Sequence, residues 1–143
     1  MPRLQVTIAL CYAALCLANQ ARNIRGATKR LSDELQRQIL PDGGHISRNP
    51  GALIELLIDL LPLRQTFSAR NIAPPPALLN AIDRMMPMLR LFRHGDGSLA
   101  LFNGMSATAP DLVATLLAYQ DSPRPLPIEN APHSGYRRMQ ADQ

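Results

Sequence analysis

The stretch with the most chemistry in this 143-residue chain is PDGGHISRNPG, residues 41–51, which lies between two leucine-rich stretches of helical spacing. The imidazole of His45 can serve as a general acid or base, and the guanidinium of Arg48 can grip a carboxylate or sulfate. Asn49 can contact a substrate, or it can cap a helix that begins at Pro50. The structural alternatives for His45 and Arg48 are a loop histidine bonded to backbone and a surface residue beside a helix.

A second glycine-punctuated loop, RHGDGSLALFNGMSATAP at residues 93–110, repeats the Asp-Gly pair of the first. Because the connections are short, the helices should alternate in direction. Both loops then emerge at one end, with NIAPPP, residues 71–76, at the other. For His94 and Asp96 the structural alternatives are a helix end and a turn. The side chains expected to converge on one rim are those of His45, Arg48, Asn49, His94, Asp96 and Asn103.

The elements that must position this rim are helices, because Leu, Ala and Met dominate the apolar residues while Trp is absent. Asn49 followed by Pro50 marks one helix start, and Thr108, Pro110 and Asp111 together are the expected start signal of the last helix. The one short strand allowed before residue 120 is Leu99–Phe102. Helices are expected over about residues 4–24, 27–40, 50–69, 76–93 and 110–119.

From residue 121 the composition changes to DSPRPLPIENAPHSGYRRMQADQ, with four prolines and no helical stripe. This segment is expected to be a linker followed by a strand around Gly135–Met139. No partner strand is evident in the chain, and a lone strand is not stable by itself. The sequence therefore predicts either a disordered tail or the front piece of something longer.

The formal net charge is +4, and Lys29 is the single lysine among 15 basic residues. An arginine excess suits anionic partners, but the chain has no block of consecutive basic residues, so a nucleic-acid partner is not expected. Cys11 and Cys16 match neither a redox pair nor a zinc site and are expected to be buried free thiols. Neither a metal nor a cofactor is expected.

The first 21 residues, MPRLQVTIALCYAALCLANQA, have features of a secretory signal peptide, with an early arginine, an apolar run and small residues after it. The apolar run is short for a membrane span. It also passes directly into ARNIRGATKRL without a loop-like cleavage region. A buried helix is the preferred interpretation, with the signal peptide as the alternative.

Three segments resemble the heparinase II/III-like polysaccharide lyases: LPDGGHISRNPGALIELLIDLLPLR, MMPMLRLFRHGDGSLALFNG and APHSGYRRM. The resemblance implies an all-α fold, made of antiparallel helical hairpins of an incomplete α/α toroid with an extended C-terminal tail. Residues 1–120 would be the toroid portion. Residues 121–143 would be a linker and the first segment of a missing β-sandwich domain, so that the chain is a fragment.

The resemblance also implies cleavage of an acidic, uronate-containing polysaccharide by β-elimination, in the periplasm or cell envelope. His45 would be the catalytic residue, and Arg48, Asn49, His94 and Asn103 would bind the substrate. The relatives carry a tyrosine where this chain has Ala52. The isolated chain is therefore expected to be inactive and, with leucine-rich helix faces exposed, to self-associate. The alternatives are a non-catalytic glycan-binding module and a small helical interaction protein.

Overall fold

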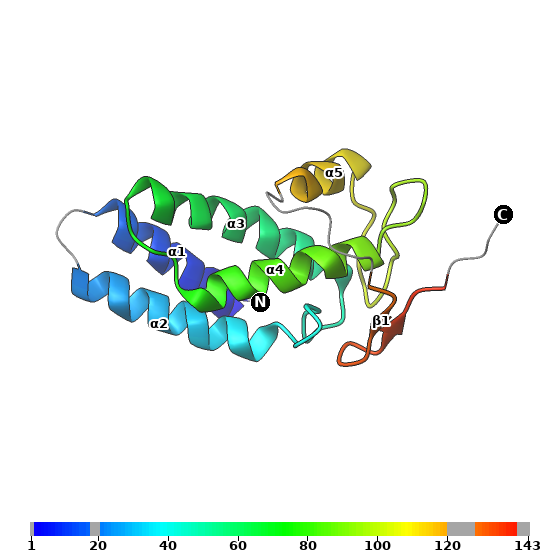
Figure 1. Cartoon of the computed structure of the whole chain (residues 1–143), viewed down its shortest axis with the longest axis horizontal. Helices are drawn as coiled ribbons and strands as arrows, with labels where there is room; N and C mark the ends of the chain where they lie inside the picture. The colour runs from blue at the N-terminus through cyan, green and yellow to red at the C-terminus, as the bar shows by residue number, and fades with distance from the viewer. Residues whose placement is uncertain (1, 18–20, 120–127, 140–143) are drawn as a thin grey trace.

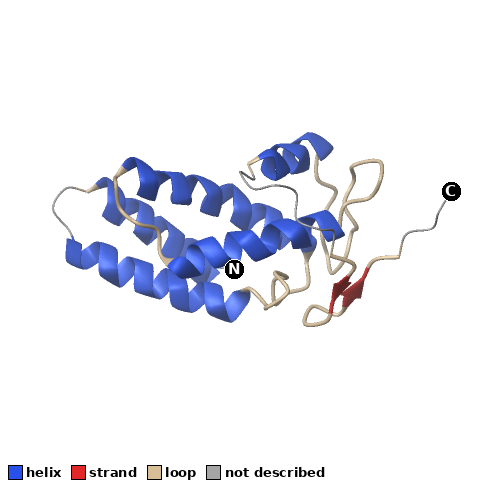
Figure 2. Cartoon of the chain, viewed as in Figure 1, coloured by secondary structure: helices blue, strands red, loops and turns tan. Residues whose placement is uncertain are grey.

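Five helices and one two-stranded hairpin form the part of the chain that the structure, a computed structural model, describes: residues 2–17, 21–119 and 128–139 (Figures 1 and 2). The mainly helical fold predicted from composition is confirmed. The elements are α1 (Pro2–Cys16), α2 (Ala21–Gln38), α3 (Pro50–Ala69), α4 (Pro76–Leu91), α5 (Pro110–Ala118), β1 (Asn130–Ala131) and β2 (Tyr136–Arg137).

The four long helices are arranged as two antiparallel hairpins laid against each other. Helix α1 packs against α2, and α3 packs against α4; across the two layers, α1 contacts α3 and α2 contacts α4. Helix α5 rests on α3. The connection between α3 and α4 lies at one end of the bundle, and the segments after α2 and α4 lie at the other end, as the alternation of helix direction predicted (Figure 1).

Helix α3 is the centre of the core. Ten of its twenty residues are buried, because α1, α4 and α5 cover it from different sides. Its residues predicted to be at helical spacing are all buried: Leu53, Leu56, Leu57, Leu60, Leu63 and Phe67. Methionines 85, 86 and 88 of α4 are buried beside it, so the prediction that they belong to the core is confirmed. Met suits this role because its unbranched side chain fills irregular gaps.

The boundary between the first two helices was predicted wrongly. The expected helix over 4–24 ends instead at Cys16, and α2 begins at Ala21, so Gly26 lies inside α2 and not at a helix end. Gly26 is exposed and a side chain there would meet nothing, so a helix tolerates it at a modest cost. Residues 18–20 lie outside the described part of the chain.

The N-terminal segment forms a packed helix, which was the preferred interpretation of the sequence, with Leu4, Ile8 and Leu15 in the core. Cys11 is buried as expected, and its burial raises the pKa of the thiol to about 11. Cys16 is exposed, contrary to expectation, because it follows the last core position of α1. Within the described residues, no helix is long and apolar enough to cross a membrane.

The predicted strand near Gly135–Met139 has a partner after all. Residues Tyr136 and Arg137 pair antiparallel with Ala131 and Asn130, so the expectation of a lone strand was wrong. A two-residue strand beside Pro132 carries no alternating pattern that the sequence could reveal. The linker expected before it falls largely on residues 120–127, outside the described residues. The strand allowed at Leu99–Phe102 is reduced to a single bridge between Leu99 and Arg93.

The loop between α2 and α3 lies directly on α4 because Gly43 has no side chain. Gly43 has a φ of +89°, and a Cβ there would overlap the backbone carbonyl of Arg84. Its N–H donates to the carbonyl of Leu40 at 2.9 Å. Both the backbone conformation and the contact with α4 therefore require glycine at this position.

Three glycine-to-alanine variants separate these two requirements. Gly43→Ala should lower the free energy of unfolding by about 2–4 kcal/mol, because it combines a left-handed conformation with a backbone clash. Gly104→Ala has the positive φ but open space around it, and about 1 kcal/mol is expected. Gly95→Ala has neither feature and should be neutral. Urea unfolding followed by circular dichroism measures all three; an equal loss in all three would contradict the contact with α4.

Candidate functional site

The two glycine-punctuated loops meet at one end of the bundle, as predicted. The side-chain amide of Asn103, in the second loop, donates to the backbone carbonyl of Arg48, in the first, at 2.7 Å. The same amide donates to the hydroxyl of Tyr136 at 2.8 Å, and that hydroxyl donates to the Arg48 carbonyl at 2.7 Å. Three segments far apart in the sequence are therefore joined at one carbonyl oxygen.

Arg48 and Asn103 both adopt the left-handed backbone conformation, with φ values of 56° and 49°. Asparagine adopts it readily and arginine does not, so the bonds from Asn103 and Tyr136 help to hold Arg48 there. The Arg48 residue as a whole is exposed. Its backbone thus holds the site together, while the residue itself is open to solvent.

His45 is buried, with 3% of its surface exposed. Its Nδ1 accepts from the backbone N–H of Ser47 at 3.1 Å and lies 2.7 Å from the Ser47 hydroxyl. Its Nε2 lies 3.2 Å from the side-chain oxygen of Gln38. This network assigns the proton to Nε2. Burial lowers the pKa of His45, so the ring is neutral and both of its nitrogens are engaged within the protein.

Asn49 is the N-cap of α3, as one of its two interpretations predicted. Its side-chain oxygen accepts from the backbone N–H of Gly51 at 2.7 Å, and Pro50 follows at a position where no donor is missed. Thr108 does not cap α5: the residue at that position is Ala109, which makes no side-chain bond. Pro110 and Asp111 lie in the first turn of α5, as expected.

Asp42 fastens the C-terminal hairpin to the first loop. Its carboxylate accepts from the backbone N–H of Ser134 at 2.6 Å, from the Ser134 hydroxyl at 2.7 Å and from the Gly44 N–H at 3.1 Å. Partial burial acts to raise the pKa of this carboxyl group. The hydrogen bonds from Ser134 and Gly44, together with nearby His133, outweigh that effect, so the pKa of Asp42 is lowered from its ordinary value of 3.8.

An aromatic cluster supports the same hairpin. The ring of Tyr136 meets the ring of Phe92 edge-on at 4.9 Å between centroids and stacks on Phe102 at 5.1 Å. These are three of the six aromatic residues in the chain. Sequence reasoning placed Ser134 and Tyr136 on an unattached tail and so missed them; the scarcity of aromatic residues was the signal that could have drawn attention to Tyr136.

His94 and Asp96 form a separate turn. The Asp96 carboxylate accepts from the N–H and hydroxyl of Ser98 at 2.9 and 2.7 Å, which lowers its pKa. His94 is exposed. Among the described residues, no hydrogen bond or ion pair joins this turn to residues 41–49. The rim expected from six side chains thus comes together at Arg48 and Asn103 and does not include this turn.

The polar groups at this end of the bundle are bonded mainly to one another and to backbone. In the described ranges, no group of three or more His, Cys, Asp or Glu residues is placed to hold a metal ion. Ala52, at the position where the lyases carry a tyrosine, is buried within α3. The fold and the site therefore define a helical bundle with a docked hairpin, in which the loop residues serve mainly the architecture.

A curated protein similar to this chain is FtsZ-localized protein C of Caulobacter vibrioides, which is 43% identical over 116 residues. The match covers 81% of this chain and 20% of that protein, so the chain spans about a fifth of the length of its relative. No family model matches the chain, and no solved structure matches it.

The resemblance to heparinase II/III-like lyases is overturned by this comparison, because the relative is named for its localization with FtsZ and not for a lyase activity. The expected cleavage of acidic polysaccharides and the polysaccharide partner were therefore wrong. The structure supplies a physical reason: His45 is buried with both nitrogens engaged, and the Asn49 side chain caps α3. The residues that suggested a lyase are residues that shape this loop.

Removing only the hydroxyl of Tyr136 tests the junction of the three segments. Tyr136→Phe keeps the ring stack but loses two hydrogen bonds, and should lower the free energy of unfolding by about 1–2 kcal/mol. Tyr119→Phe is the matched control, because Tyr119 is 42% exposed and its hydroxyl makes no hydrogen bond in the described part. Hydrogen exchange should show the loss of protection concentrated in residues 130–137. Equal effects of the two variants would contradict a structural role for the Tyr136 hydroxyl.

The attachment of the hairpin should weaken in acid. Because the folded-state pKa of Asp42 is lowered, its stabilising contribution is complete above the unfolded value of 3.8 and is lost as the pH falls below that value toward the folded pKa. The protection factor of the Ser134 amide, corrected for the intrinsic exchange rate, should drop over this range. Asp42→Asn should show low protection at every pH, whereas Asp96→Asn should behave as wild type. A pH-independent protection factor in the wild type would contradict this role of Asp42.

Proposed function

We propose that this chain is a protein-interaction module that acts with the cell-division protein FtsZ. The observation that carries the proposal is the 43% identity over 116 residues to FtsZ-localized protein C. Identity at this level over four-fifths of the chain supports a shared fold and a related role. The small helical interaction protein, one of the alternatives from sequence, is the class that fits.

The architecture supports an interaction role. The core of α3 and α4 is closely packed and leucine-rich, so the bundle offers fixed surfaces. The exposed large apolar residues include Ile46, Leu101 and Phe102 at the loop end. Exposed Arg48 lies in the same region. Apolar side chains beside an arginine are a common composition for a protein-binding surface.

We also propose how the two helical hairpins are arranged. We infer that the two hairpins stack in the manner of an incomplete α/α toroid, because α1 and α2 form one layer on α3 and α4. We likewise propose that the chain divides into a helical part, residues 1–120, and a linker followed by a further segment, residues 121–143. Residues 128–139 are attached to the helical part by hydrogen bonds that involve Asp42 and Tyr136.

Binding to purified FtsZ, measured by biolayer interferometry with the chain immobilised, tests the proposal. We expect saturable binding that weakens about fivefold in Arg48→Glu, since reversing an exposed charge replaces an attraction by a repulsion. The fold should tolerate this change, because Arg48 serves it through its carbonyl. Arg70→Glu is the matched control, since Arg70 is exposed at the opposite end of α3.

A fluorescent fusion of the chain, expressed in Caulobacter vibrioides, supplies the cellular measurement. The expected result is co-localization with FtsZ, lost when FtsZ is depleted. A diffuse fusion together with no binding to purified FtsZ would overturn the proposal. Binding that is unchanged in Arg48→Glu would remove Arg48 from the contact and leave the module intact.

A further inference from the structure

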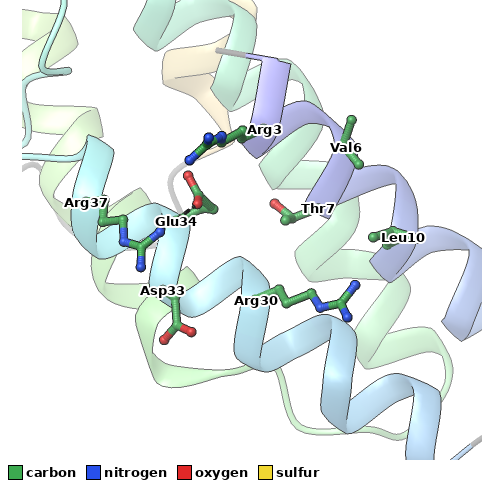
Figure 3. A pocket seen from close by; sticks show the side chains of 8 residues that line it. All are labelled: Arg3, Val6, Thr7, Leu10, Arg30, Asp33, Glu34 and Arg37. Carbon is green, nitrogen blue, oxygen red and sulfur yellow. Dashed lines mark hydrogen bonds and ion pairs between the residues drawn. The ribbon is translucent and has the colours of Figure 1, made fainter.

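A groove runs between α1 and α2. One part of it has a volume of about 420 Å³ and is lined by both helices (Figure 3). A second part, about 360 Å³, continues along the same pair of helices and shares Leu10 and Arg30 with the first. The groove therefore follows much of the length of α1.

The apolar residues of α1 that line this groove have the spacing of a helix-packing seam. Val6, Leu10 and Ala13 lie in α1 at intervals of four and three residues, which keeps them on one side of the helix, and Leu17 follows directly after the end of α1. Val6 is 58% exposed, Leu10 40% and Leu17 56%. A second stripe of α1, including Leu4, Ile8 and Leu15, faces the core. Helix α1 thus has one apolar side that is buried and one that is open.

The charges around the groove are mainly positive. Four arginines line it, Arg3, Arg22, Arg30 and Arg37, against two acidic residues, Asp33 and Glu34. Figure 3 shows the side chains of Arg3 and Arg30 reaching into the space from opposite helices.

Both acidic residues are already engaged. Asp33 pairs with Lys29 at 3.2 Å, and Glu34 pairs with Arg37 at 3.1 Å and accepts from Gln38 at 2.9 Å. Within residues 2–17, 21–119 and 128–139, Arg3, Arg22 and Arg30 make no ion pair. The groove therefore has cationic edges with unused charge beside an apolar floor.

We propose that this groove binds an amphipathic helix of a partner protein, one with an apolar stripe flanked by acidic residues. The seam spacing fits a helix lying along α1 and α2, and the arginines that make no ion pair within the described residues favour acidic flanks. In a symmetric contact a second copy of this chain would present the same arginine-lined groove and not acidic flanks, so its charge does not complement the groove. The inference rests on the proposed interaction function and names the surface and the chemistry of a partner.

The experiment uses the full chain and a designed, fluorescently labelled helical peptide of about three heptads, with leucine at the seam positions and glutamate on both flanks. A matched peptide carries lysine in place of each glutamate. Anisotropy titrations are made at peptide concentrations where the peptide is monomeric. We expect the acidic peptide to bind, the basic peptide to bind at least about tenfold more weakly, and the affinity for the acidic peptide to fall with salt.

Two pairs of variants locate the binding on the chain. Arg30→Glu should weaken binding about tenfold, whereas Arg25→Glu, an exposed arginine of α2 outside the groove, should not. Leu10→Ser should weaken binding about tenfold. Ile58→Ser is its control, because Ile58 has a similar exposure of 42% but lies on α3. All four positions are exposed, so the variants should fold, which circular dichroism confirms.

Binding of neither peptide, or equal binding of both, overturns the inference. The inference is also overturned if light scattering shows a dimer that Leu10→Ser converts to monomer, because a second copy of the chain then fills the groove. Binding to vesicles with anionic lipid but not to the acidic peptide overturns it in favour of a membrane surface. If Arg30→Glu abolishes peptide binding but not FtsZ binding, the groove is supported as a helix-binding site and FtsZ binds to another surface. FtsZ binding without peptide binding overturns the groove alone.

Discussion

Two glycines after Asp42 let three parts of the chain approach one another more closely than side chains would permit. A Cβ on Gly43 would overlap the backbone of α4, and a Cβ on Gly44 would overlap the Ser134 side chain. The loop between α2 and α3 is therefore in contact with α4 on one side and the C-terminal hairpin on the other. The Asp42 carboxylate, the neutral ring of His45 and the capped start of α3 all take their positions from this close approach.

The two layers of the bundle are covered to different degrees. Helix α3 is enclosed by α1, α4 and α5, so it carries apolar residues on several sides. Helix α2 has a strongly polar outer side, and α1 has an apolar stripe that no described residue covers. The core and the groove proposed to bind a partner helix therefore lie on opposite sides of α1.

Much of the helical fold could be predicted from sequence, because it rests on local signals. The leucine spacing of α3, the Asn49–Pro50 start and the alternation of helix direction were sufficient to place both loops at one end. The break before Ala21 could not be predicted, since the apolar run and Gly26 suggest a longer first helix and a later boundary. The hairpin partner at Asn130 was missed because a strand of two residues has no periodicity.

The site was harder to interpret than the fold. An exposed loop with histidine, arginine and asparagine has the same composition whether its side chains face a substrate or their own backbone. Burial decides between these for His45, and a hydrogen bond to Gly51 decides for Asn49. The burial of His45 depends on the tertiary fold and is not local in sequence, whereas the Asn49 cap is local and the Asn49–Pro50 pair already indicated it. The likeness to the lyases followed residues that determine how this loop folds, and the chemistry inferred from them did not transfer.

The two cysteines differ in exposure, and this difference provides a single site for attaching a fluorescent label. Cys11 is buried and holds its proton, with a pKa of about 11, whereas Cys16 is exposed at the end of α1. Because the thiolate is the reactive form, a maleimide dye at neutral pH should modify Cys16 and spare Cys11. A single fluorophore can therefore be placed next to the open stripe of α1 in the unaltered protein, where it would report directly on what comes to lie there.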